Sequence, residues 1–250
     1  MNESNESINE KMPFTEHLEE LRKRLIRSLY AVGIGFVLCY LFKERLYGVL
    51  TMPLNDVLPE GSSMIFTSLP EAFFTYLKVA FFAAILLTMP FILYQIWKFI
   101  SPGLYSTEKK YVTPFVFFSS LFFIGGSLFA YFIVFPFGFK FFLAFGTDDI
   151  KPMLTMKEYL SFSFKLLFAF GVIFELPVFM FFLGKIGVVN SRMLIKKRKY
   201  AILLVFITAA LFTPPDIVTQ IMMAVPLMIL YEASIWVVKA GEKKTDAQQE

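Results

Sequence analysis

The stretch LSFSFKLLFAFGVIFELPVFMFFLGKI, residues Leu160 to Ile186, decides the fold of this chain. It is an apolar run with one carboxylate, Glu175, which lies midway between Lys165 and Lys185. As a helix, the run would place Glu175 roughly 15 Å from either lysine, which is the mid-depth of a bilayer. A carboxylate there is costly in lipid, so we expect it to face protein or water. Pro177 withholds a backbone N–H and bends the helix, and a bent helix with an inward-facing acid implies a cavity.

The composition predicts an integral membrane protein. Hydrophobic residues make up 57% of the chain, with 33 Phe among 250 residues, far more than in a soluble domain. One Cys (Cys39) and one His (His17) exclude a disulfide framework and a Cys/His zinc cluster. In a soluble protein, the net charge of +4 would suggest binding to nucleic acid. In a membrane protein, the positions of Lys and Arg indicate instead which loops face the cytoplasm. We expect no nucleic-acid partner, no metal and no cofactor.

The apolar runs predict an all-α, polytopic membrane protein with six transmembrane helices in a single membrane domain. Residues 1–12 are expected to form a short disordered cytoplasmic tail, and residues 239–250 a second cytoplasmic tail. Residues 43–72 are long enough to hold short helices of their own, and residues 137–159 are predicted to form a second substantial loop. The predicted spans are about 25–42, 73–100, 114–136, 160–186, 200–213 and 217–238.

The last two spans are predicted to form a hairpin of short helices. The run from Tyr200 to Thr213 would be some 21 Å long as a helix, against a hydrocarbon core of about 30 Å. Pro214-Pro215-Asp216 stops it. Alternatively, the fifth span extends through Lys196 to Lys199, whose charged ends would reach the membrane surface.

Charge predicts the orientation of the spans. Most of the 24 Lys and Arg residues fall on the side of the N-terminal tail. The positive-inside rule then places both termini in the cytoplasm, and an even number of spans agrees with that.

Catalysis is not expected. The sequence has no G-x-S-x-G, no H-E-x-x-H and no Gly-rich phosphate loop, and its one His lies in a charged segment before the first span. We therefore predict that the chain has no catalytic residues and is not an enzyme.

Two charged segments could receive a cationic ligand. In the first, His17 to Leu25, the plain interpretation is a solvated helix end with the pairs Glu19–Lys23 and Glu20–Arg24 at i,i+4 spacing.

The second charged segment runs from Phe99 to Glu108. Its plain interpretation is a helix start at which Ser106 is the N-cap and Glu108 interacts favourably with the helix dipole.

At these stretches the sequence resembles TatC, the core subunit of the twin-arginine protein translocase. The resemblance covers about residues 12–239, and four motifs in matching order make it specific. They are Leu18-x-Glu20-Leu21-Arg22-x-Arg24, Phe99-x-x-Pro102-x-Leu104-Tyr105-x-x-Glu108, Phe170-Gly171-x-x-Phe174-Glu175-x-Pro177 and Thr213-Pro214-Pro215-Asp216.

The resemblance implies a binding site for signal peptides that carry paired arginines. Its matching acids are Glu20 and Glu108, and a fixed carboxylate pair suits the planar, permanently charged guanidinium better than lysine. Phe99 matches a family aromatic that could line the same patch by apolar or cation–π contact. Arg22 is expected to hold Glu20 in place.

The resemblance also implies a concave, cup-like bundle with Glu175 on its concave side, near the apolar region of a signal peptide or a partner helix. A structural role for Glu175 at the Pro177 bend is the alternative. Thr213, Asp216 and Gln220 match positions where TatA and TatB, the family's single-span partners, are thought to dock. Alternatively, Asp216 caps the sixth helix.

We therefore expect a receptor and scaffold in the bacterial cytoplasmic (inner) membrane. It would bind twin-arginine signal peptides of folded proteins and assemble with TatA and TatB in a larger complex that includes further copies of itself. Transport would draw on the proton gradient, and the lipid bilayer is the other expected partner. Two alternatives are a proton-coupled solute transporter that uses Glu175, and a purely structural scaffold.

Overall fold

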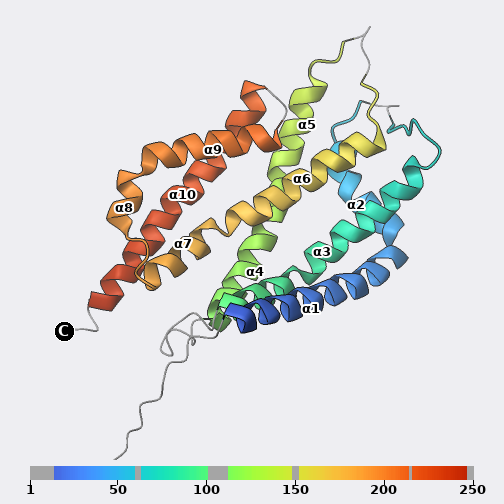
Figure 1. Ribbon diagram of the computed structural model, residues 1–250. Helices are drawn as coiled ribbons and strands as arrows, with labels where there is room; N and C mark the ends of the chain where they lie inside the picture. The colour runs from blue at the N-terminus through green and yellow to red at the C-terminus, as the bar shows by residue number, and fades with distance from the viewer. Residues whose placement is uncertain (1–13, 60–62, 101–111, 148–151, 214–215, 247–250) are drawn as a thin grey trace, which may run out of the picture.

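The computed structural model describes residues 14–59, 63–100, 112–147, 152–213 and 216–246 (Figure 1). Almost all of them are helical, which confirms the all-α prediction. The helices are α1 (Phe14–Leu41), α2 (Lys43–Asn55), α3 (Glu71–Ile100), α4 (Val112–Phe129), α5 (Phe135–Leu143), α6 (Met156–Phe174), α7 (Leu176–Lys185), α8 (Ser191–Lys196), α9 (Arg198–Phe212) and α10 (Ile217–Asp246), with a π-helical segment at Ala130–Val134.

Within the described residues, five helical segments are long and apolar enough to cross a membrane, so the chain is a multi-pass membrane protein. They are Thr15–Leu41, Glu71–Ile100, Thr113–Leu143, Met156–Lys185 and Ile217–Glu242. The fifth predicted span corresponds to α9, which has 15 residues and is about 22 Å long. It does not extend continuously through the lysines, because α8 and α9 are separated at Lys197.

The expectation of a short sixth helix is wrong. α10 has 30 residues and continues to Asp246, well past the end of its apolar part. Ala240, Glu242 and Lys243 are good helix formers, so the helix does not stop where the hydrophobic residues do.

The helices run between two ends of the molecule (Figure 1). We call the first end the one where α1 and α4 begin and where α3, α7 and α10 end, towards the lower left of the figure. The start of α3, the start of α6 and the end of α5 lie at the second end. The described chain thus begins and ends at the same end of the molecule.

The fourth span is broken in its middle, as Pro177 predicts. α6 ends at Phe174 and α7 begins at Leu176, with Glu175 between them and Pro177 in the first turn of α7. The Glu175 N–H bonds to the Val172 carbonyl at 3.1 Å, an i→i−3 bond that tightens the chain at the break.

The third span is longer than predicted, and the loop expected from residue 137 begins only after Leu143. The helix continues from α4 into α5 through the π-helical segment just before Pro136. Pro136 lies in the first turn of α5, where its missing N–H is tolerated, so it does not end the helix.

α4 and α6 cross at very close range. A Cβ on Gly126 would lie 2.4 Å from the Phe170 carbonyl oxygen, and one on Gly171 would lie 2.8 Å from the Phe123 ring. The Ser127 hydroxyl donates to the Leu167 carbonyl at 3.2 Å across the same contact. Small residues at this crossing therefore let the two backbones pack directly.

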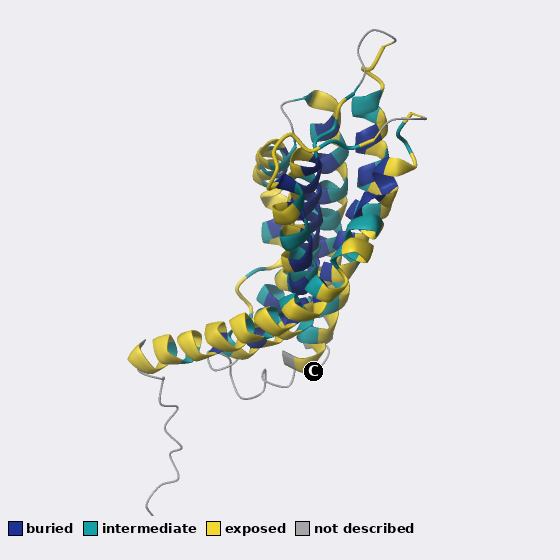
Figure 2. Cartoon of the chain, turned by 90° about the vertical axis from the view of Figure 1, so that its right-hand side faces the viewer, coloured by how far each residue is buried: buried dark blue, intermediate teal, exposed yellow. Residues whose placement is uncertain are grey.

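α1 packs mainly against α3 and exposes the rest of its surface. Figure 2 shows a helix that is exposed along much of its length, and Leu29, Ile34 and Leu41 of α1 are 70%, 66% and 71% exposed. Such an apolar surface suits lipid or another membrane helix.

A small cap at the second end joins α3 to α6. Residues 43–72 contain the helix α2, as their length allowed. Ile65 and Thr155 form an isolated β-bridge. Side chains cap the helix starts here, since Oε2 of Glu71 accepts the Ser68 N–H at 3.3 Å and the Thr155 hydroxyl accepts the Glu158 N–H at 3.3 Å.

Candidate functional site

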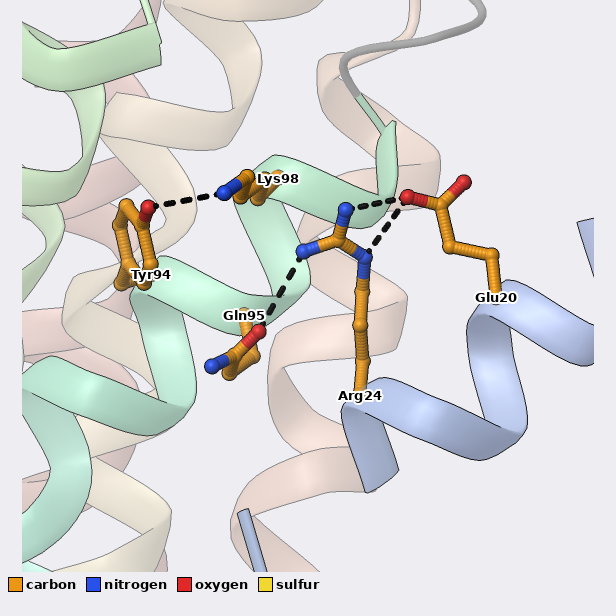
Figure 3. Close-up of polar contacts among 5 residues, drawn as sticks. All are labelled: Glu20, Arg24, Tyr94, Gln95 and Lys98. Carbon is orange, nitrogen blue, oxygen red and sulfur yellow. Dashed lines mark hydrogen bonds and ion pairs between the residues drawn. The ribbon is translucent and has the colours of Figure 1, made fainter. Parts of the chain in front are cut away.

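At the first end, polar side chains of α1 and α3 form one hydrogen-bonded group around Arg24 (Figure 3). Arg24 is buried, with 8% exposed. Its Nε and Nη2 both donate to Oε1 of Glu20, the former at 3.1 Å, and its Nη1 donates to Oε1 of Gln95 at 3.3 Å. Glu20 is thus tied through Arg24 to the neighbouring helix α3.

This contact corrects the expectation for Arg22, because Arg24 is the residue that holds Glu20. Residues four apart lie on one face of a helix, whereas residues two apart point about 200° away from each other. Arg22 is accordingly exposed. The i,i+4 pair Glu20–Arg24, which the plain interpretation of this segment contained, is present.

The second carboxylate oxygen of Glu20 keeps its capacity to accept a hydrogen bond. This atom, Oε2, is buried and has no hydrogen-bond partner within the described part of the chain. A carboxylate can accept several donors, and a buried acceptor without one is costly. The site can therefore take one more donor, such as an N–H of a cationic ligand.

Phe99 lies on the same side of α1 as Glu20. Its ring stacks on His17, with centroids 4.3 Å apart and planes 20° apart. His17 precedes Glu20 by three residues and so shares its helix face. The structure thus places Phe99 beside the face of α1 that carries Glu20, through an aromatic contact that was not predicted from the sequence.

The acids and bases of α1 line an open cleft of about 320 Å³ at this end. Glu19 pairs with Lys23 at 2.7 Å, and both side chains are exposed, so the pair adds little stability. The lining residues are Glu16, Glu19, Glu20, Lys23, Arg24 and Arg27.

Glu108, the second predicted acid, lies outside the described residues, as does Ser106. Its distance from Glu20 therefore stays a prediction.

Glu175 lies at the α6–α7 break within a polar chain that crosses three segments. The Trp97 indole of α3 donates to the Ser119 hydroxyl of α4 at 2.9 Å, and Ser119 interacts with the Glu175 carboxylate. Oε1 of Glu175 is buried and has no partner in the described chain. Trp97 stacks on Phe115, centroids 5.0 Å apart, so this polar chain is enclosed by aromatic rings.

Thr213, Asp216 and Gln220 each make a hydrogen bond within the hairpin. Asp216 caps α10, since its Oδ1 accepts the Thr219 N–H at 2.8 Å and its Oδ2 accepts the Thr219 hydroxyl. The Thr213 hydroxyl donates to the Ala209 carbonyl at 2.9 Å. The Gln220 amide donates to the Phe206 carbonyl at 3.2 Å and ties α10 to α9. The capping alternative for Asp216 is confirmed.

Gln95, Trp97 and Ser119 were not among the predicted site residues. Gln95 could have been predicted from the sequence. An amide inside the apolar run 73–100 costs free energy in the membrane unless it is hydrogen-bonded, so a polar partner was to be expected. Among the described residues, no group of three or more His, Cys, Asp or Glu side chains could hold a metal ion.

Comparison with known proteins identifies the family. A family model described as Sec-independent protein translocase protein (TatC) matches residues 16–226. The chain belongs to the TatC family. The matched residues include the Glu20 group, the α6–α7 break and the hairpin.

Individual TatC proteins match along nearly all of the chain. TatC of Desulforapulum autotrophicum is 57% identical over 241 residues, which cover 96% of this chain and 89% of that protein. TatC of Magnetococcus marinus is 48% identical over 246 residues, 98% of this chain and 90% of that protein. The crystal structure of a twin-arginine translocase receptor, TatC, has a TM-score of 0.80 at 40% identity and covers 90% of this chain and 99% of that chain. These names describe a role in protein transport.

Proposed function

We propose that this chain is the receptor subunit of a twin-arginine translocase and that its first end binds the paired arginines of a signal peptide. The main support is the Glu20 carboxylate: Arg24 fixes one oxygen, and the other is buried with no hydrogen-bond partner among the described residues. Because its position is set before binding, little conformational entropy is lost when a peptide donates to it.

The geometry favours arginine over lysine. A guanidinium is planar and presents a fork of donors, so it can share a carboxylate with Arg24 and still reach a second acceptor. The lysine ammonium is a compact point charge and is more strongly hydrated. Glu108 would supply the second acid, as the family motif implies, and would take the second arginine.

The stacked rings of Phe99 and His17 would provide an apolar wall for the peptide. A guanidinium placed over an aromatic face is attracted by the ring electrons, which adds about 0.5–1 kcal/mol at an exposed site. Arg22, exposed on another side of α1, would contribute less than Arg24.

The first end would face the cytoplasm, where signal peptides emerge. It carries the basic residues Lys98, Lys196 to Lys199 and Lys239, and the positive-inside rule assigns such an end to the cytoplasmic side. Both termini would then be cytoplasmic, in the bacterial inner membrane.

TatA and TatB would be the membrane partners, with transport driven by the proton gradient. Thr213, Asp216 and Gln220 lie near the turn of the hairpin, at the second end. They would form the site at which a single-span helix docks. Glu175 would meet the apolar part of the peptide or a partner helix. The chain would also associate with further copies of itself in a larger complex.

The proton-coupled carrier that uses Glu175 is not favoured, because the matching proteins are described as translocase components. A carrier would lose transport when Glu175 is neutralised and would be insensitive to Glu20.

A binding experiment tests the receptor function. Fluorescent peptides with an Arg-Arg pair, or with Lys-Lys in its place, are titrated against the full-length protein in nanodiscs. Glu20→Gln should weaken Arg-Arg binding at least tenfold, because a charge-assisted hydrogen bond is worth about 1.5–3 kcal/mol. Lys-Lys peptides should bind weakly even to the unchanged protein.

Glu19→Gln is the matched control, since Glu19 is the neighbouring acid but is exposed and paired with Lys23. It should change the affinity by less than about twofold. Equal affinity of the Glu20→Gln variant and the unchanged protein would contradict the proposal, and Glu108→Gln tests the second acid in the same assay.

A further inference from the structure

A second polar cavity lies away from Glu20, between the short helix α8, the start of α9 and the last third of α10. Its volume is about 440 Å³. It combines two cations with a large aromatic side chain, and its lining residues are Ile195, Arg198, Ile235, Trp236, Lys239 and Ala240.

The helices around this cavity are fixed to one another. The carboxylate of Glu242 on α10 accepts the N–H and the hydroxyl of Ser191, at 2.7 and 2.6 Å, and so caps α8. The Tyr231 hydroxyl donates to the Leu194 carbonyl at 2.8 Å. Arg198 and Lys239 are therefore carried by a rigid frame rather than by a loose loop.

The cavity has an excess of positive charge. Arg198 uses Nη2 to pair with Glu232 at 2.7 Å, and both side chains are nearly half exposed, so its other N–H groups are open to a ligand. Lys239 is exposed and has no carboxylate partner in the described part of the chain. The exposed lysines 196, 197 and 199 adjoin Arg198 in sequence but do not line the cavity.

Trp236 places this cavity at the level of lipid headgroups. Trp236 is 75% exposed, and it lies three residues before Lys239, the first charged residue after the apolar part of α10. An exposed Trp near the end of a membrane-spanning helix is typical of the interface, where its ring meets acyl chains and its N–H meets polar groups. Ile195, 44% exposed, adds apolar surface beside it.

We propose that this cavity binds the headgroup of an anionic phospholipid. Arg198 and Lys239 would hold the phosphate, while Trp236 and Ile195 would contact the glycerol and the first part of an acyl chain. Cationic pockets between membrane helices on the side rich in Lys and Arg suit such headgroups. The proposal uses no residue of the Glu20 site and does not depend on signal-peptide binding.

The intrinsic fluorescence of Trp236 gives a direct test. The chain has two Trp residues, and Trp97 is buried, with 5% exposed, so Trp236 should dominate the response to quenchers in lipid. The full-length protein is reconstituted in phosphatidylcholine bilayers that contain brominated phosphatidylglycerol or the same fraction of brominated phosphatidylcholine. A Trp236→Phe variant supplies the Trp97 background.

We expect brominated phosphatidylglycerol to be enriched at Trp236 at least fivefold over brominated phosphatidylcholine. Lys239→Gln should lower this enrichment about fivefold, because it removes a cation that lines the cavity and would bind the phosphate directly. Lys239→Arg, which keeps the charge, should preserve it, and Arg198→Gln should lower it as well. Excess inorganic phosphate should not displace the lipid.

Lys196→Gln is the matched control, because Lys196 is exposed in the same basic segment but does not line the cavity. A loss equal to that of Lys239→Gln would mean diffuse surface attraction and would overturn the site. Equal quenching by the two brominated lipids would overturn it too. Full displacement by phosphate would assign the cavity to a free anion, and displacement by an acidic peptide with no lipid preference would assign it to a protein partner; either result rejects the lipid site.

Discussion

At the scale of single residues, Arg24 is the centre of the candidate site. It is a buried cation on a helix that is otherwise largely exposed, and it joins Glu20 of its own helix to Gln95 of α3. A buried charge is tolerated only when it is paired and hydrogen-bonded, and Arg24 satisfies both conditions through its fork of donors. We propose that Arg24 positions Glu20 and does not itself contact the peptide.

Arg24→Gln should therefore weaken both stability and peptide binding. The substitution leaves Glu20 and Gln95 without their shared donor, which should cost about 1.5–3 kcal/mol of unfolding free energy and let the carboxylate move. Arg24→Lys should be intermediate, because one ammonium cannot reproduce the fork. Thermal unfolding and titration with an Arg-Arg peptide measure the two effects.

Arg22→Gln is the comparison for this prediction, since Arg22 is exposed and does not hold Glu20. It should change either quantity only slightly. A larger loss of affinity for Arg22→Gln than for Arg24→Gln would reject the positioning role of Arg24.

Spacing within one helix was enough to predict the pairs Glu19–Lys23 and Glu20–Arg24, because i,i+4 neighbours follow from helix geometry alone. It could not predict the Arg24–Gln95 bond or the His17–Phe99 stack. Those contacts depend on how α1 lies against α3, and packing between helices is not encoded in the periodicity of either one.

At the scale of the elements, α4 and α6 pack closely at two glycines, which have no side chain to hold the helices apart. Gly126 of α4 lies against the backbone of Phe170, and Gly171 of α6 lies against Phe123. The crossing also fixes the lower part of α6, which leads directly into the break at Glu175. Close packing of the two helices thereby sets where the intramembrane acid is placed.

Gly126→Ala should destabilise the protein by about 1–3 kcal/mol, because a Cβ would lie 2.4 Å from the Phe170 carbonyl oxygen and the helices would have to separate. Gly125→Ala is the matched control, since a Cβ on Gly125 has nothing within 4 Å. It should be neutral or stabilise the helix by up to about 1 kcal/mol. Unfolding midpoints in one detergent compare the pair, and equal midpoints would show that the crossing is looser than described.

Hydrophobicity predicted the order of the apolar helices but not where the helices end. The break at Glu175 was predictable because Pro177 lacks an N–H. The continuation of the third span past Pro136 was not, since it depends on a π-helical segment that has no sequence signature. The length of α10 was missed because charged helix formers extend a helix beyond the membrane.

At the scale of the whole molecule, the two ends are built differently. The first end carries the Glu20 group and the basic cavity, both open to ligands. The second end is closed by Glu71, which is buried, with 6% exposed, and accepts the N–H groups of Thr67 at 2.7 Å and Lys157 at 3.0 Å. This one carboxylate fastens the start of α3 to the start of α6.

Glu71→Gln should lower stability without changing peptide affinity. An amide offers one acceptor oxygen in place of two and turns donors towards N–H groups, so we expect a loss of about 1.5–3 kcal/mol. α3 has 30 residues and is about 45 Å long, which separates Glu71 from the Glu20 site at its other end. Glu158→Gln, an exposed acid of the same cap, should cost under about 0.5 kcal/mol. If the Glu71→Gln variant remained folded at the assay temperature but bound an Arg-Arg peptide more weakly, the two ends would be coupled through α3, and the cap would have to be treated as part of the receptor.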